Sequence, residues 1–175
     1  NVGLDFSFRK IFSGSFEYYI KNGSDLIGNS PIAASSGFLA ATGNFADIRG
    51  TGYDLNLNSK IIDHGQFKWS NNFLFSYAID EVTRYKGGTT SAIDVSIVEG
   101  KPFHAIFVNQ FGGLDQVGDP LGYLNGDLTK DYSALNRKPA ADKAYYLTQP
   151  KYFGAFRNTL SYNAFSVSFN LVFKA

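Results

Sequence analysis

Residues 66–80 read Gln-Phe-Lys-Trp-Ser-Asn-Asn-Phe-Leu-Phe-Ser-Tyr-Ala-Ile-Asp, and this stretch decides the fold class. Its apolar row, at odd positions, consists of Phe67, Trp69, Phe73, Phe75, Tyr77 and Ile79. Its polar row, at even positions, includes Lys68, Ser70, Asn72, Ser76 and Asp80. Asn71 and Leu74 are the two exceptions. A period of two predicts a β-strand. The strand exceeds the usual length of about 5–6 residues and reaches the roughly 9–11 residues that cross a bilayer at a tilt.

The same alternation recurs in five other segments, which are residues 4–9, 16–21, 53–58, 156–162 and 165–174. Tight turns are predicted near Phe12, near His64 and at Asn163-Ala164. A two-residue turn at the last position sets Tyr162 opposite Phe165 and leaves both apolar rows on one side of the sheet. The sequence therefore predicts six long antiparallel strands, and it predicts no helix.

The connections between these strands alternate between short and long. The long ones are residues 21–46 and 81–151, and both are predicted to be irregular. We call residues 81–151 the excursion, and within it we expect Phe103 to Phe111 to form a small hairpin with neighbouring residues. Short turns on one side and long loops on the other are typical of outer-membrane barrels, whereas compact soluble domains seldom contain loops beyond about 12–15 residues. Because a membrane barrel needs about eight strands, six strands predict part of a larger barrel.

Composition excludes several classes of function. The 175 residues include 17 Phe, 11 Tyr and 1 Trp, so 17% of the chain is aromatic, as in β-rich proteins. Lys and Arg number 16 against 15 Asp and Glu, and a net charge of +1 argues against nucleic acid as a partner. With no Cys, the chain offers no disulfide, thiolate metal site or cysteine nucleophile.

The sequence predicts no catalytic residue, resident metal or cofactor, because it lacks a nucleophile elbow, a phosphate loop, a zinc motif and an EF-hand. Three carboxylates of the excursion are weak calcium candidates, and they are Asp115, Asp119 and Asp127. The Asp-Pro and Asn-Gly steps beside them explain the same residues as turn formers. The run Gly50-Thr51-Gly52 precedes a strand, and predicts a bulge or a close approach between strands.

Several short motifs of the chain, in this order and spacing, resemble a known family. They are Ile48-Arg49-Gly50-Thr51-Gly52-Tyr53-Asp54-Leu55, Glu99-Gly100-Lys101-Pro102-Phe103, Gly113-Leu114-Asp115, Gly118-Asp119-Pro120-Leu121-Gly122-Tyr123, and Pro150-Lys151-Tyr152-Phe153-Gly154-Ala155-Phe156-Arg157-Asn158-Thr159. Together they are similar to the late barrel strands of the SusC/RagA family of TonB-linked outer-membrane transporters.

The resemblance implies that residues 1–175 are a C-terminal-side portion of a barrel of about 22 strands. It implies import of oligosaccharides or peptides through the outer membrane of a Gram-negative bacterium, under a SusD-like lipoprotein. The plug domain and the TonB-contacting region are expected in sequence outside these residues.

On this interpretation the apolar row faces membrane lipid, and four polar side chains line the lumen: Lys68, Ser70, Asn72 and Ser76. Trp69, Tyr162 and Phe165 are expected in an aromatic girdle near the tight turns. The excursion is expected to contact substrate or the lipoprotein lid through Phe111, Tyr123, Tyr132, Tyr145 and Tyr146. Two alternatives stay open, a soluble β-sandwich of the carbohydrate-binding or adhesin kind and a purely structural β-protein, in which the aromatic rows form a core.

Overall fold

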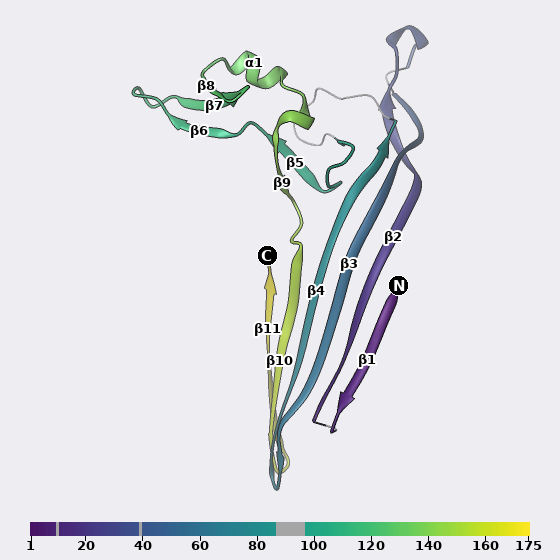
Figure 1. The fold of residues 1–175 in the computed structure, drawn as a ribbon, viewed down its shortest axis with the longest axis vertical. Coiled ribbons are helices and arrows are strands. Elements are labelled where there is room, and N and C mark those ends of the chain that lie inside the picture. Colours follow the sequence, from purple (N-terminus) through teal and green to yellow (C-terminus); the bar gives the residue numbers. More distant parts are fainter. Residues whose placement is uncertain (10, 39, 87–96) are drawn as a thin grey trace. The chain divides into compact units, whose positions relative to one another are not determined.

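The structure is a computed structural model that describes residues 1–9, 11–38, 40–86 and 97–175. A six-stranded antiparallel sheet dominates it, in the order β1-β2-β3-β4-β10-β11 (Figure 1). The strands are β1 (Val2–Phe8), β2 (Phe12–Pro31), β3 (Ala40–His64), β4 (Phe67–Tyr85), β10 (Tyr152–Tyr162) and β11 (Phe165–Lys174). The prediction of six long antiparallel strands is confirmed.

Two boundaries differ from the prediction. The connection 21–46 was predicted to be an irregular loop and is mostly strand, because β2 continues to Pro31 and β3 begins at Ala40. Hydrogen bonds between neighbouring backbones sustain a strand where the alternation of side chains has faded. The first turn also lies earlier than predicted, since Phe8 is already paired with Phe12.

The turn at Asn163-Ala164 is confirmed. Tyr162 pairs with Phe165, and Asn163 has a φ of 51°, in the left-handed region that asparagine tolerates.

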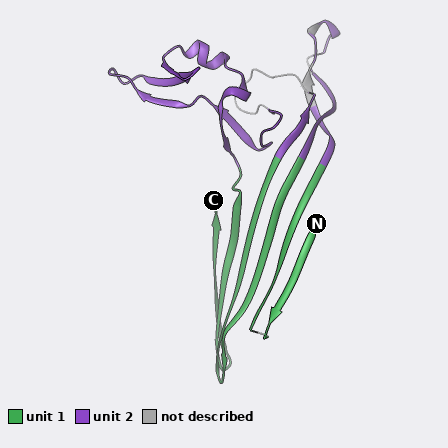
Figure 2. Cartoon of the chain, viewed as in Figure 1, with its two compact units in different colours: residues 1–22, 49–80, 149–175 green, residues 23–48, 81–148 purple. Residues whose placement is uncertain are grey.

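The chain divides into two units (Figure 2). Unit 1 comprises residues 1–22, 49–80 and 149–175, and unit 2 comprises residues 23–48 and 81–148. Unit 1 holds the tight-turn half of the large sheet. The apolar side chains that the structure records as buried, Ala46, Val82, Ala105, Phe107 and Leu135, all belong to unit 2.

Unit 1 is a single sheet layer in the part of the chain that the structure describes. Gly52 and the polar Asn158 are the residues of unit 1 recorded as buried there, and every residue of β11 is exposed, with Phe165 at 80%. A β-sandwich needs a second sheet over its apolar face. The described residues supply none, so the aromatic rows of unit 1 do not form the core of a sandwich.

Unit 2 contains small elements of its own. β5 (Ala105–Val108) pairs with β9 (Ala144–Leu147), and β6 (Phe111–Leu114), β7 (Pro120–Leu124) and β8 (Asp127–Thr129) form a three-stranded sheet. The expected hairpin of Phe103 to Phe111 with neighbouring residues is therefore wrong, because the partner of β5 lies much later in the chain. Short strands carry too little pattern to specify a distant partner.

Unit 2 also contains helices that the sequence did not predict: α1 (Tyr132–Arg137), η1 (Ala34–Ser36) and η2 (Ala140–Asp142). Asp131 caps α1, since its side chain accepts a hydrogen bond from the Ala134 backbone N–H at 2.9 Å. Leu135 of α1 is buried against Gly122 of β7, where an added Cβ would lie 2.7 Å from a Leu135 methyl carbon. This contact explains why a helix of only six residues is held in place.

Candidate functional site

The predicted lumen row shares one face with polar residues of the next two strands. In the ladder between β4 and β10, Lys68 lies opposite Ser161, Ser70 opposite Thr159, Asn72 opposite Arg157, and Ser76 opposite Phe153. The ladder between β10 and β11 extends the row to Ser166, Ser168 and Asn170. Directly opposed residues of neighbouring strands point to the same side of a sheet. Hydroxyl, amide and cationic groups therefore occupy one face across three strands.

Asn72 joins this face to β3. Its Nδ2 donates to the Oδ1 atoms of Asn56 at 2.8 Å and of Asn58 at 2.9 Å. Beside this amide network lies a hollow of about 260 Å³, lined among others by Ser13, Lys60, Ser70, Arg157 and Thr159. The sequence indicated that the even-numbered residues of β4 form a polar face. The hydrogen bonds of Asn72 with Asn56 and Asn58 depend on the register between β3 and β4, which the sequence did not specify.

The opposite face is aromatic from strand to strand. Tyr53 stacks on Tyr77 with ring centroids 5.0 Å apart, and Phe73 lies 6.3 Å from Phe156 and 6.4 Å from Phe173. Many of the side chains on this face are largely exposed in unit 1. An extended, uncovered aromatic face beside a polar face fits a wall between lipid and a water-filled lumen.

The polar exception on the apolar row has a specific environment. Asn71 lies opposite Asn158, which is only 5% exposed, and Trp69 donates from Nε1 to Asn158 Oδ1 at 3.2 Å. The Asn71 Oδ1 atom is enclosed and has no hydrogen-bond partner in the structure. Of the two side-chain amides on the apolar face, that of Asn158 thus accepts a hydrogen bond from Trp69, an interaction that the sequence did not predict.

A close approach occurs at Gly52, as predicted for the run Gly50-Thr51-Gly52. A Cβ added at Gly52 would meet the Tyr19 ring and would lie 2.5 Å from the backbone oxygen of Tyr77. Only glycine leaves room for the Tyr19 ring to lie across β3 at this point.

The five aromatic candidates of the excursion fall into two groups within unit 2. Phe111, Tyr123 and Tyr132 belong to the β6–β8 sheet and α1, whereas Tyr145 and Tyr146 belong to β9. Sequence alone did not separate these groups, because β9 comes after α1 in the chain and pairs with the earlier β5.

Their roles also differ. Tyr132 donates its hydroxyl to the Pro120 carbonyl at 2.9 Å, and Tyr145 packs against Phe107, with the Lys101 ammonium 5.2 Å from its ring centroid. Phe111 and Tyr146 are 66% and 60% exposed. These last two are the members of the set with the most surface available to a partner.

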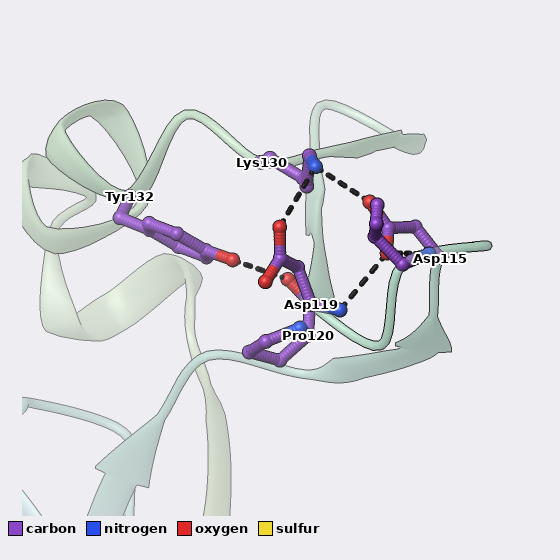
Figure 3. Close-up of polar contacts among 6 residues, drawn as sticks. Asp115, Asp119, Pro120, Lys130 and Tyr132 are labelled. Atoms are coloured by element: carbon purple, nitrogen blue, oxygen red, sulfur yellow. Dashed lines mark hydrogen bonds and ion pairs between the residues drawn. The ribbon is translucent and has the colours of Figure 1, made fainter.

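Two of the weak calcium candidates are ion-paired to a lysine instead. Lys130 Nζ lies 2.5 Å from Asp115 Oδ2 and 3.0 Å from Asp119 Oδ2, between the two carboxylates (Figure 3). Asp115 Oδ1 also accepts the backbone N–H groups of Val117 and Asp119, each at 2.9 Å. Among the described residues, no group of three or more potential metal-binding side chains occurs.

These contacts shift the proton affinities of the cluster. The Lys130 hydrogen bond, followed by that from the Asp119 backbone, lowers the pKa of Asp115 to about 2, and the two carboxylates raise the pKa of Lys130. Asp127 lies elsewhere, at the end of the turn Asn125-Gly126, whose φ values of 52° and 96° suit a tight hairpin. The turn-forming explanation for the sequence therefore agrees with the structure.

Arg84 forms an ion-pair cluster that sequence analysis missed. Its Nε lies 2.7 Å from Asp47 Oδ2, and a terminal nitrogen lies 3.6 Å from Asp25 Oδ1. The Asp25 backbone N–H donates to Asp47 Oδ1 at 2.8 Å, and this bond, with Arg84, lowers the pKa of Asp47. The cluster ties β2, β3 and β4 together in unit 2, and nothing in the spacing of residues 25, 47 and 84 could have predicted it.

Comparison with known proteins identifies the sheet. TonB-dependent receptor P3 of Formosa agariphila is 26% identical over the whole chain, and TonB-dependent receptor SusC of Bacteroides thetaiotaomicron is 24% identical over 98% of it. The solved structure of the RagAB peptide transporter superposes on 97% of the chain with a TM-score of 0.77 at 20% identity. The chain is a SusC/RagA-like barrel segment.

The RagAB peptide importer in its open-open state gives the same result, with a TM-score of 0.79 over 95% of the SusC/RagA-like chain at 18% identity. The chain spans only about a fifth of the length of these relatives, 20% of receptor P3 and 18% of SusC. No protein-family model matches the chain. No helix of the described residues is long and apolar enough to cross a membrane.

Proposed function

We propose that residues 1–175 form a C-terminal-side part of the barrel wall and external loops of an outer-membrane TonB-dependent transporter in a Gram-negative bacterium. The observation that carries the proposal is the two-faced single layer of unit 1, aromatic on one side and polar on the other. Lipid on the aromatic face and water on the polar face satisfy both sides at once. The chain acts as a transporter component and not as an enzyme.

The cargo is an oligosaccharide or a peptide, and the partner outside the membrane is a SusD-like lipoprotein. RagAB is named a peptide transporter, and SusC is named a TonB-dependent receptor, which supports this class of activity. The TonB complex is engaged by a region outside these residues, and nucleic acid is not a partner. Lys68, Ser70, Asn72 and Ser76 line the lumen in this proposal.

The excursion provides the contact with cargo or lid. The β6–β8 sheet packs on α1 through Leu135, yet it leaves large apolar side chains in water. Among them, Phe111, Leu114 and Val117 are 66%, 62% and 82% exposed. Large apolar side chains left exposed on a folded element are typical of protein-contact surfaces.

Deletion of residues 118–130 from the full-length transporter tests this role. The deletion removes β7, β8 and Lys130, and we expect weaker substrate uptake or weaker capture of the lipoprotein, with normal folding and insertion of the barrel. Phe111→Ser should reproduce part of the loss, whereas Asn136→Ala, on the exposed surface of α1, should not. If uptake and lipoprotein capture both survive the deletion, the excursion is not the contact surface.

The β-sandwich alternative receives no support from the structure, because no second sheet covers the aromatic face within the described residues.

A further inference from the structure

Two positively charged side chains meet at the hollow on the polar face of unit 1. Two cationic residues, Lys60 and Arg157, line it together with four hydroxyl-bearing residues, Ser13, Ser59, Ser70 and Thr159. The described residues that line it include no carboxylate. Lys60 lies 4.0 Å from Asp63, which it shares with Lys68 at 3.6 Å, and Arg157 has no ion-pair partner among the described residues. Positive charge is therefore in excess at this point.

The amide network beside the hollow adds hydrogen-bond donors. Asn72 uses both hydrogens of its Nδ2 on the Oδ1 atoms of Asn56 and Asn58, so these two acceptors are occupied within the protein. Asn58 Nδ2 also makes a long contact of 3.5 Å with Asn56 Oδ1. The amino groups of Asn56 and Asn58 keep hydrogens that can be donated outward. With the ammonium and guanidinium groups of the two cations, donors outnumber acceptors around the hollow, although its four hydroxyl groups and the unpartnered Asn71 Oδ1 can also accept.

We propose that this hollow is a binding site for the carboxylate of a transported solute, either the terminal carboxylate of a peptide or the carboxylate of an acidic sugar. The proposal rests on the proposed transport function, which places this face in the lumen. Arg157 offers a planar fork that matches a carboxylate, and Lys60 offers a second charge on a flexible stem. At about 260 Å³ the hollow lies below the roughly 300–1,000 Å³ of ordinary ligand pockets, which suits one terminal group and not a whole oligomer.

A site of this kind binds the solute weakly and transiently as it passes through the lumen. Its cationic side chains are exposed, so each contact with an anion contributes modestly and is screened by salt. A transporter requires low affinity at such a site, because a solute bound tightly in the lumen would not be released. The site therefore selects for acidic cargo without trapping it.

The test compares acidic probes with matched neutral probes on the purified full-length transporter. The probes are acetyl-trialanine with a free carboxylate and its C-terminal amide, and digalacturonate and its methyl ester. An environment-sensitive dye is attached at Ser161→Cys, two residues from Thr159 on the same face, and this chain contains no other cysteine. Calorimetry on the unlabelled transporter supplies the same comparison if the dye does not respond.

We expect each acid to bind about three- to tenfold more tightly than its neutral counterpart, as one or two partly exposed charge-assisted contacts allow. Arg157→Gln and Lys60→Gln should each reduce that preference. Lys174→Gln is the matched control, since Lys174 lies opposite Phe153, away from the hollow, and its loss should leave the preference intact. The acid that binds more tightly identifies peptide or acidic sugar as the source of the carboxylate.

Equal affinity for the acidic and neutral probes, or a preference that survives Arg157→Gln and Lys60→Gln together, would overturn the assignment. TonB-dependent uptake by cells is measured in parallel. Uptake that persists without any preference for acids rejects the site and leaves the transport function standing. Absence of uptake by the wild-type protein rejects the transport function, whatever the hollow binds.

Discussion

Replacing Phe73 by arginine tests which face of the sheet meets lipid. Phe73 follows Phe67, the first residue of β4, by six positions. At about 3.4 Å per residue and a tilt of about 40°, it lies about 16 Å from the tight-turn end. The apolar band of an outer-membrane barrel is about 25 Å tall, so its middle lies about 12 Å from either edge. In the proposed barrel, Phe73 therefore lies within a few ångströms of mid-membrane.

An arginine at mid-membrane on the lipid face costs about 2–4 kcal/mol. The substitution also removes ring contacts with Phe75, Phe156 and Phe173, whose centroids lie 6.3–6.4 Å from that of Phe73, and these add about 1 kcal/mol. We expect a total loss of about 3–5 kcal/mol in the free energy of folding. This corresponds to a change of more than about 100-fold in the folding equilibrium.

The control is Leu74→Arg, which exchanges an apolar side chain for arginine one residue along the strand, on the other face. Leu74 is 42% exposed, and an arginine in a water-filled lumen should cost less than about 1 kcal/mol. Asn72→Arg should also cost about 1 kcal/mol, through loss of its bonds to Asn56 and Asn58. The assay is urea unfolding of the full-length transporter in lipid vesicles. Equal costs at Phe73 and Leu74 would refute the assigned faces.

Expressed alone, residues 1–175 should not give a closed, heat-resistant monomer in detergent, because β1 and β11 each leave one edge unpaired; recovery of such a monomer by refolding would contradict this. Gly52→Ala should destabilise the barrel by about 1–3 kcal/mol in urea unfolding, because its Cβ meets the Tyr77 backbone oxygen at 2.5 Å, whereas Gly50→Ala, with 3.9 Å to its nearest neighbour, should be tolerated. The pKa of Asp115 lies at about 2, below its ordinary value, so its carboxylate stabilises the loop above about pH 4 and this support is lost as the pH falls towards 2. The protection factors of the Val117 and Asp119 amides, which are corrected for the intrinsic pH dependence of hydrogen exchange, should fall over that range, and in Lys130→Met the fall should begin at a higher pH; an unchanged profile would show that Lys130 does not set the pKa.

The alternation of apolar and polar residues predicted the strands of the sheet, because successive side chains of a β-strand point to opposite faces. The alternation in residues 66–80 and 165–174 is strong enough to specify strand, length and face without any partner. The register of the last hairpin followed from its two-residue turn. Where alternation fades, as in residues 22–31, the strand persists through backbone hydrogen bonds that leave no trace in the side chains.

The candidate site was less predictable, because its contacts join residues far apart in the chain. The bonds between Asn72 and Asn58, between Trp69 and Asn158, and between Lys130 and Asp115 depend on register or on loop conformation. Asp115 and Asp119 looked like oxygen ligands for calcium, and the lysine that neutralises them comes from another strand end. Sequence indicated the kinds of side chain involved but not which of them meet.

The central claim is that the large sheet is a membrane wall with lipid on its aromatic face and water on its polar face. Spin labels placed singly at residues 72–77 of the full-length transporter in lipid vesicles, with any cysteine outside residues 1–175 replaced by serine, test it most directly, through collisions with oxygen and with a water-soluble nickel complex. We expect alternation, with oxygen favoured at residues 73, 75 and 77 and nickel favoured at residues 72, 74 and 76. Equal access to both reagents along this stretch, or the opposite alternation, would contradict it.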